Sequence, residues 1–209
     1  MSQPLPLSEE HRDCLQEVCN IAMGAAGESL ANFAQVFVNL SIPKIRYIDP
    51  KEIPESLSSL QGEYNVSGVV QSFTLYGEET LNGEEAFALV VITEPSFQDL
   101  SATAGRVLNS QADAENLLKE LSATINRTCL PRLAELMETQ LDYSEPDIFA
   151  HNIALSDLRL YDIAGWDHVV SIEINYHLEN HPFNCDLLLL LPDDMVERLR
   201  DALELLLAD

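Results

Sequence analysis

The chain has 209 residues and a mass of 23.3 kDa, which is enough for one domain with a substantial core. Its 46% hydrophobic and 22% charged residues are typical of a folded globular protein. With 35 acidic and 11 basic side chains the formal net charge is −24, which repels phosphate backbones and anionic lipids and so argues against nucleic acid or a membrane as a direct partner.

Several other classes of protein are disfavoured by the residue pattern. No apolar run approaches the roughly 20 residues that a membrane helix requires. The first residues lack a basic segment followed by an apolar one, so no secretion signal is expected. The four cysteines form no CxxC pair and the five histidines are scattered, which argues against a disulfide framework or a zinc site. We therefore expect a cytoplasmic protein with no metal or cofactor of its own.

A long helix is predicted near the start of the chain. Ser8 is a favourable N-cap, the two glutamates after it suit the first turn, and no proline interrupts the pattern over residues 9–37. One side of this helix is apolar, with Leu15, Val18, Ala22 and Ala25. A run of small residues from Gly24 to Gly27 allows another backbone to approach closely.

The opposite side of the same helix carries a polar triad, Asp13, Glu17 and Asn20. These residues stand at i, i+4 and i+7, so they lie within about 60° of one another around the helix axis. The triad is thus expected on a face that packing does not require.

The rest of the first half reads as strand, hairpin and helix. Residues 44–48 predict a short strand and 49–63 a loop. Two β-rich segments, Tyr64–Tyr76 and Glu85–Thr93, flank an Asn82-Gly83 turn and predict a hairpin. A short helix then begins at Pro95, with Phe97, Leu100, Ala104 and Val107 as its apolar residues.

The second half repeats this order. A helix is predicted over 113–141, followed by an extended stretch over 147–160, a hairpin over 169–177 and 184–191, and a final helix from Pro192. An offset of 103 residues places Pro43 on Pro146 and Glu17 on Glu120. We expect one domain, residues 1–209, built of two repeats at about 8–109 and 110–209.

The fold class that follows is α+β. We expect a largely antiparallel sheet with helices packed on it and a pseudo-twofold axis between the repeats. The strands alternate only weakly between apolar and polar residues, so their order is left open.

The spacing of the polar triad and the proline after it resembles the signature of a known family. The sequence Asp13-x3-Glu17-x2-Asn20-x22-Pro43 fits the pattern (Asp or Ser)-x3-Glu-x2-Asn-x22-Pro of the CheC/CheX/FliY phosphatases of bacterial chemotaxis. The small-residue run after Asn20-Ile21 is similar to that family too, and the duplication matches the CheC-like fold. By contrast, the sequence has no GxSxG elbow, P-loop or GxGxxG motif.

This resemblance implies hydrolysis of the aspartyl phosphate on a phosphorylated response-regulator receiver domain, with the catalytic Mg²⁺ held by the receiver. Asn20 would orient the attacking water, because a carboxamide both donates and accepts hydrogen bonds and does not titrate. Glu17 would pair with a lysine of the receiver. Asp13 is a weaker candidate for docking, and Pro43 is interpreted as structural.

The second repeat departs from this pattern. Glu120 is present, but Asn116 replaces the aspartate and Ala123 stands where the asparagine belongs. Alanine cannot hold a water molecule, so this half is expected to be catalytically inactive. Asn126 cannot replace it, because three helical residues turn the chain by about 300°.

Two other readings remain open at this point. A module of the same fold could bind a receiver or a motor-switch protein without turnover, or the charge of −24 could mark an acidic decoy. A decoy has no use for the spaced triad, which favours the phosphatase. The sequence leaves open which receiver is the substrate, whether a regulatory partner binds, and whether the chain forms a homodimer.

Overall fold

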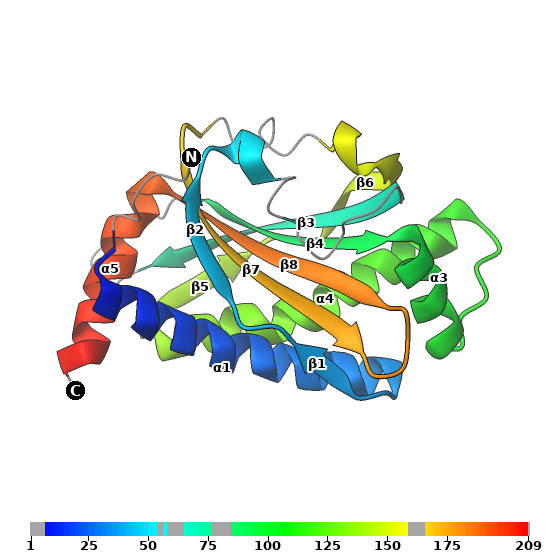
Figure 1. Cartoon of the computed structure of the whole chain (residues 1–209), viewed down its shortest axis with the longest axis horizontal. Helices are drawn as coiled ribbons and strands as arrows, with labels where there is room; N and C mark the ends of the chain where they lie inside the picture. The colour runs from blue at the N-terminus through cyan, green and yellow to red at the C-terminus, as the bar shows by residue number, and fades with distance from the viewer. Residues whose placement is uncertain (1–6, 54–56, 58–64, 77–84, 159–165, 209) are drawn as a thin grey trace.

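The structure, a computed structural model, describes residues 7–53, 57, 65–76, 85–158 and 166–208 (Figure 1). The helices are α1 (Glu9–Ala34), α3 (Glu94–Thr103), α4 (Gln111–Leu136) and α5 (Asp193–Ala208), with short 3₁₀ turns η1 (Pro50–Glu52) and η3 (Leu155–Asp157). The strands are β1 (Val38–Leu40), β2 (Lys44–Ile48), β3 (Asn65–Tyr76), β4 (Ala86–Thr93), β5 (Gln140–Tyr143), β6 (Asp147–Ala154), β7 (Val169–Leu178) and β8 (Asn184–Pro192). The α+β prediction is confirmed.

The strands form one antiparallel sheet in the order β1-β7-β8-β4-β3-β5. Strand β2 also pairs with β7, and β6 also pairs with β3. The two predicted hairpins, β3–β4 and β7–β8, therefore lie side by side at the centre of the sheet, joined through β4 and β8. Each hairpin is completed at its outer edge by two short strands that come from the other half of the chain. This exchange gives the pseudo-twofold arrangement expected from the repeat.

Helices α1 and α4 pack against each other on one face of the sheet (Figure 1). Their buried positions follow the same phase, offset by 103 residues: Leu15 and Leu118, Val18 and Leu121, and Ala22 and Ile125 are all buried. Where the helices meet, the hydroxyls of Ser29 and Thr128 lie 2.8 Å apart. The offset found in the sequence is thus the offset at which the two helices bury equivalent stripes.

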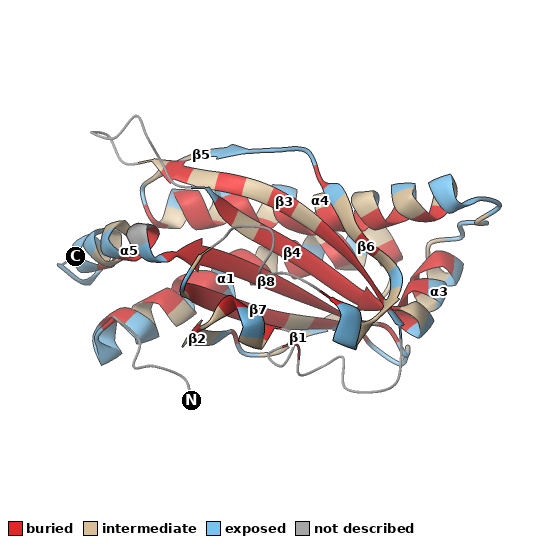
Figure 2. Cartoon of the chain, turned by 90° about the horizontal axis from the view of Figure 1, so that it is seen from above, coloured by how far each residue is buried: buried red, intermediate tan, exposed pale blue. Residues whose placement is uncertain are grey.

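Both faces of the central strands are covered, which explains their weak alternation. Ile172 and Ile174 of β7 belong to the core beneath the helices, whereas Val169 of β7 and Leu188 of β8 belong to a smaller core on the other face. Figure 2 shows β4, β7 and β8 almost wholly buried and β5 exposed at one edge. Strands buried on both faces carry nearly continuous apolar runs.

The two long helices end earlier than the sequence predicts. Helix α1 stops at Ala34 and α4 at Leu136, and each is followed by a residue in the left-handed region, Gln35 (φ 56°) and Glu138 (φ 53°). Glycine or asparagine usually marks such an end, and neither is present here. The short strand β1, which follows the first of these turns, was therefore not predicted. The first two residues of β5 were predicted as helix.

Two further predictions need comment. The short helix α3 ends at Thr103, before Gly105 with a positive φ of 65°, so Val107 is not part of it and is 78% exposed. The Asn82-Gly83 turn lies outside the described residues. Within the described ranges, none of the helices has the length and apolar character needed to cross a membrane.

In the run of small residues from Gly24 to Gly27, another segment approaches the helix closely at Gly27 and not at Gly24. Beside Gly27, a β-carbon would lie 2.9 Å from Cδ1 of Leu40 in β1, whereas nothing lies within 4 Å of a β-carbon at Gly24. A second close approach occurs in the sheet, where a β-carbon on Gly68 of β3 would collide with the ring of Phe149 in β6. Gly68 also lies at a shift in the β3–β6 register.

We expect Gly68→Ala to lower the free energy of unfolding by about 1–3 kcal/mol, because the Phe149 ring and the β6 backbone must move to admit a methyl group. Urea unfolding followed by circular dichroism measures the change. Gly24→Ala is the matched control, and we expect it to raise stability by up to about 1 kcal/mol through helix propensity. A Gly68→Ala midpoint at or above that of the wild type would contradict the packing described here.

Candidate functional site

The polar triad lies on the exposed side of α1. Asp13, Glu17 and Asn20 are all exposed, and the opposite stripe of the helix is buried in the core with Leu15, Val18 and Ala22. The prediction that this polar face is exposed and this apolar stripe buried is therefore confirmed. The chemical roles of the three residues stay predictions.

Hydrogen bonds on both sides of Asn20 fix α1 in place. The side-chain amide of Gln16 donates to the carbonyl oxygen of Pro43 at 2.8 Å, which ties the helix to the segment between β1 and β2. The buried hydroxyl of Tyr176 in β7 donates to the carbonyl oxygen of Met23 at 3.2 Å. Pro43 itself is buried, in agreement with its interpretation as structural. Asn20 thus stands between two attachments of a helix that cannot slide or rotate freely.

The triad is acidic and free of intramolecular partners in the part of the chain described here. No described lysine, arginine or histidine lies within 4 Å of the carboxylates of Asp13 or Glu17, and no described residue bonds to the side chain of Asn20. Next to Asp13, partial burial raises the pKa of the Cys14 thiol above its usual value. Cys14 is therefore held as a neutral thiol near pH 7 and is not an activated nucleophile.

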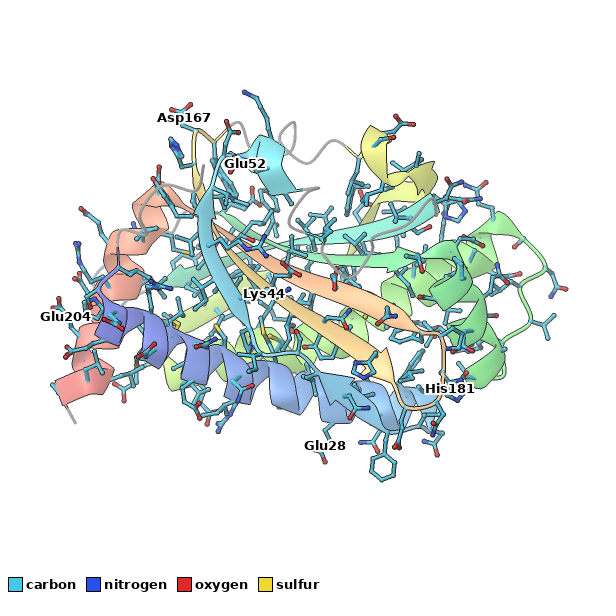
Figure 3. The ribbon with its side chains drawn as sticks, in the orientation of Figure 1. Glu28, Lys44, Glu52, Asp167, His181 and Glu204 are labelled. Carbon is cyan, nitrogen blue, oxygen red and sulfur yellow. The ribbon has the colours of Figure 1, made fainter. Side chains whose placement is uncertain are left out.

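A groove runs along one edge of the triad, between α1 and the C-terminal end of α5. It has a volume of about 450 Å³ and is lined by Glu10, Asp13, Cys14, Glu17, Val18 and Ile21 of α1, Leu136 of α4, and Leu206 and Leu207 of α5. Helix α5 lies beside the first turns of α1, with Glu204 near that end of α1 (Figure 3). His11 Nε2 of α1 lies 3.9 Å from Glu204 Oε1. This shallow groove combines three exposed carboxylates with apolar side chains, of which Val18 is buried.

The equivalent face of α4 has a different composition and a different neighbour. Glu120 is exposed but bonded, because the Arg106 guanidinium donates to its carboxylate at 2.6 Å. Ala123 is half-buried and offers no polar group. Asn126 is buried, and its amide donates to Gln71 at 2.9 Å, so it is a core residue as expected from the helix geometry.

The sequence did not reveal which segments lie against these two faces, the end of α5 beside Glu17 and Arg106 beside Glu120. Nothing in the pattern around Arg106 connects it with Glu120, and the leucines at the end of α5 read as one side of an ordinary amphipathic helix. Both contacts depend on how distant segments meet in the folded chain. Among the described residues, no group of three or more His, Cys, Asp or Glu lies close enough together to hold a metal ion.

Fold and site together define a class: a two-repeat α+β domain that displays a glutamate–asparagine pair on one of its two central helices. No family model and no curated protein matches the sequence. Several solved structures share the fold. FliY from Thermotoga maritima superposes with a TM-score of 0.69 at 17% identity, over 96% of this chain and 98% of that chain.

Two other solved structures extend this comparison. CheX from Desulfovibrio desulfuricans has a TM-score of 0.54 at 14% identity, over 83% of this chain and 99% of its own. The middle domain of FliM from H. pylori has a TM-score of 0.59 at 10% identity, over 94% and 99%. At these identities the similarity establishes the fold, and it confirms the expected CheC/CheX/FliY fold.

Proposed function

We propose that this protein is a cytoplasmic phosphatase that hydrolyses the aspartyl phosphate of a response-regulator receiver domain in chemotaxis or two-component signalling. The observation that carries the proposal is the exposed Glu17–Asn20 pair, at the spacing of the family the chain resembles, on a helix anchored from both sides. The fold shared with FliY and CheX supports it.

Asn20 is the proposed catalytic residue. An acyl phosphate is already reactive, and the receiver's own Mg²⁺ and lysine supply charge to the transition state, so the main task left is to place a water in line with phosphorus. The Asn20 carboxamide suits this task because it can accept a hydrogen bond from the water and donate one to a phosphoryl oxygen. Since no described residue bonds to its side chain, it is available to enter the receiver's site.

Glu17 is the proposed docking residue. It lies one turn before Asn20 on the same exposed face, and no described cation of this chain competes for its carboxylate. An ion pair with the receiver's lysine would fix the register in which Asn20 approaches the phosphate. Asp13 lies one turn before Glu17, toward the N-terminus, and adds negative charge at the edge of the same surface.

A second candidate function is binding of a receiver, or of a motor-switch partner, without turnover. The second repeat favours it, because the same helix is built there without the asparagine. Both functions would use the same Glu17–Asn20 surface of α1. They differ only in whether Asn20 promotes hydrolysis of the phosphate. Protein partners are known for this fold, since FliM from H. pylori was solved as a complex with SpeE.

We expect Asn20→Ala to remain folded, to bind the phosphorylated receiver and to lose about 10²- to 10³-fold in stimulated phosphate release. Loss of one preorganised positioning group typically costs that much in rate, and alanine is the better helix former at an exposed position. Phosphate release from receiver domains loaded with acetyl phosphate measures the effect. Phosphate release at the wild-type rate by Asn20→Ala would contradict the catalytic role of Asn20 and leave only the binding function.

We expect Glu17→Ala to weaken receiver binding as well as turnover, because its proposed role is an ion pair with the receiver. Titration with a beryllofluoride-activated receiver measures the binding, and phosphate release measures the turnover. Glu120→Ala is the matched control at the equivalent position of α4, and both quantities should stay near wild type. Loss of activity in the control would show that the second repeat takes part in the reaction.

We expect the rate of dephosphorylation at low receiver concentration to fall as ionic strength rises. The net charge of −24 steers a receiver with a basic docking face, and salt shortens the reach of that field to about 10 Å at 0.1 M. Measurements of kcat/KM over a series of NaCl concentrations test this. A value independent of salt would exclude steering by the overall charge.

A further inference from the structure

The groove beside Glu17 has a counterpart in the second repeat. The residues of α1 that line the first groove include Glu10, Asp13, Cys14 and Glu17, and the residues of α4 that line the second are Asp113, Asn116, Leu117 and Glu120. Each member of the second set lies 103 residues after a member of the first. The two grooves are therefore related by the pseudo-twofold axis, and differences between them reflect what faces each helix.

The second groove is partly covered by the chain's own connection between α3 and α4. Arg106, Val107 and Leu108 of this connection line it, and about 170 Å³ remains. The Arg106 guanidinium meets Glu120 at 2.6 Å. Of the two apolar residues that follow in the chain, Leu108 is half-buried against the core, whereas Val107 is 78% exposed. A cation with a half-buried apolar side chain two residues after it is thus the occupant that this groove accepts.

The first groove presents the same helix face without such an occupant. Leu136, Leu206 and Leu207 form its other wall, it is larger at about 450 Å³, and its lining contains three carboxylates and no cation. Two of its apolar side chains are well exposed, Ile21 at 40% and Leu207 at 48%. Carboxylates next to exposed apolar side chains fit a partner surface that brings a positive charge and an apolar side chain together.

We propose that this groove is the specificity pocket for the receiver, and that it takes an apolar side chain adjacent to the lysine that pairs with Glu17. The Arg106-Val107-Leu108 connection in the second repeat serves as the internal template for this mode of docking. The inference rests on the proposed function, because it assigns the receiver as the occupant. It adds a second contact beyond the Glu17 ion pair, so that charge brings the receiver in and apolar burial selects among receivers.

Ile21→Ser and Leu207→Ser test this contact, because each removes an apolar side chain from the groove at an exposed position. The probe is a CheY-type receiver domain activated with beryllofluoride, titrated against each variant, together with steady-state dephosphorylation. We expect each variant to weaken binding by about tenfold, with the loss in KM rather than in kcat. Leu205→Ser is the matched control on the same helix: Leu205 is 68% exposed and does not line this groove. Its binding should stay within about twofold of wild type.

Cys14 gives a second readout that does not depend on a substitution. It lines the groove and is the one cysteine of the four that is not buried. Bound receiver should slow its alkylation by iodoacetamide several-fold, at a pH high enough to form the thiolate despite the raised pKa.

The outcomes separate the two proposals. Turnover by the wild type with unchanged binding in both groove variants, or with unprotected Cys14, would overturn the groove and leave the phosphatase intact. Binding that depends on Ile21 and Leu207 without any turnover would overturn the phosphatase and support the groove. A wild type that binds no receiver would overturn both.

Discussion

The burial of one stripe on each of the two central helices is the constraint on which the rest of this structure depends. Leu15, Val18 and Ala22 of α1 must face the core, and their equivalents in α4 do the same. Since a helix has only one other side, burial of that stripe determines that Asp13, Glu17 and Asn20 face outward. The bonds from Gln16 to Pro43 and from Tyr176 to Met23 then fix the helix along and around its axis. An exposed polar face on an anchored helix is thus obtained from core packing without any specialised loop.

Much of this arrangement could be predicted from the sequence, because it depends on periodicity within single elements. The long helices, the two hairpins and the exposure of Asn20 all follow from patterns local to their segments. The ends of the helices could not be predicted, since the left-handed residues there are Gln35 and Glu138 and not the glycine or asparagine that usually marks such an end. The groove was missed for a related reason: its walls come from α1 and α5, which lie at opposite ends of the chain.

The comparison of the two repeats shows how the same scaffold supports an open and a closed surface. Around Glu17, the facing segment is apolar and leaves space, whereas around Glu120 the facing segment supplies Arg106 and partly covers that space. Loss of the asparagine at position 123 and neutralisation of the glutamate at 120 therefore occur together in one half. The surface chemistry of each half depends on which segment faces its central helix, α5 in one half and the α3–α4 connection in the other, and the core packing is maintained in both.

The exchange of edge strands between the two halves affects how the chain can fold while it is being synthesised on the ribosome. Among the strands that the structure describes, β1 and β2 pair only with β7, and the outer edge of β3 pairs only with β5 and β6. While the first half is being synthesised, its short strands have no partner and one edge of its hairpin is open, a state prone to pairing with other chains. Because these contacts join residues distant in sequence, folding is slow relative to a helical bundle of the same size. The nascent chain therefore depends on completion of the second half, and on protection until then, to reach its first stable structure.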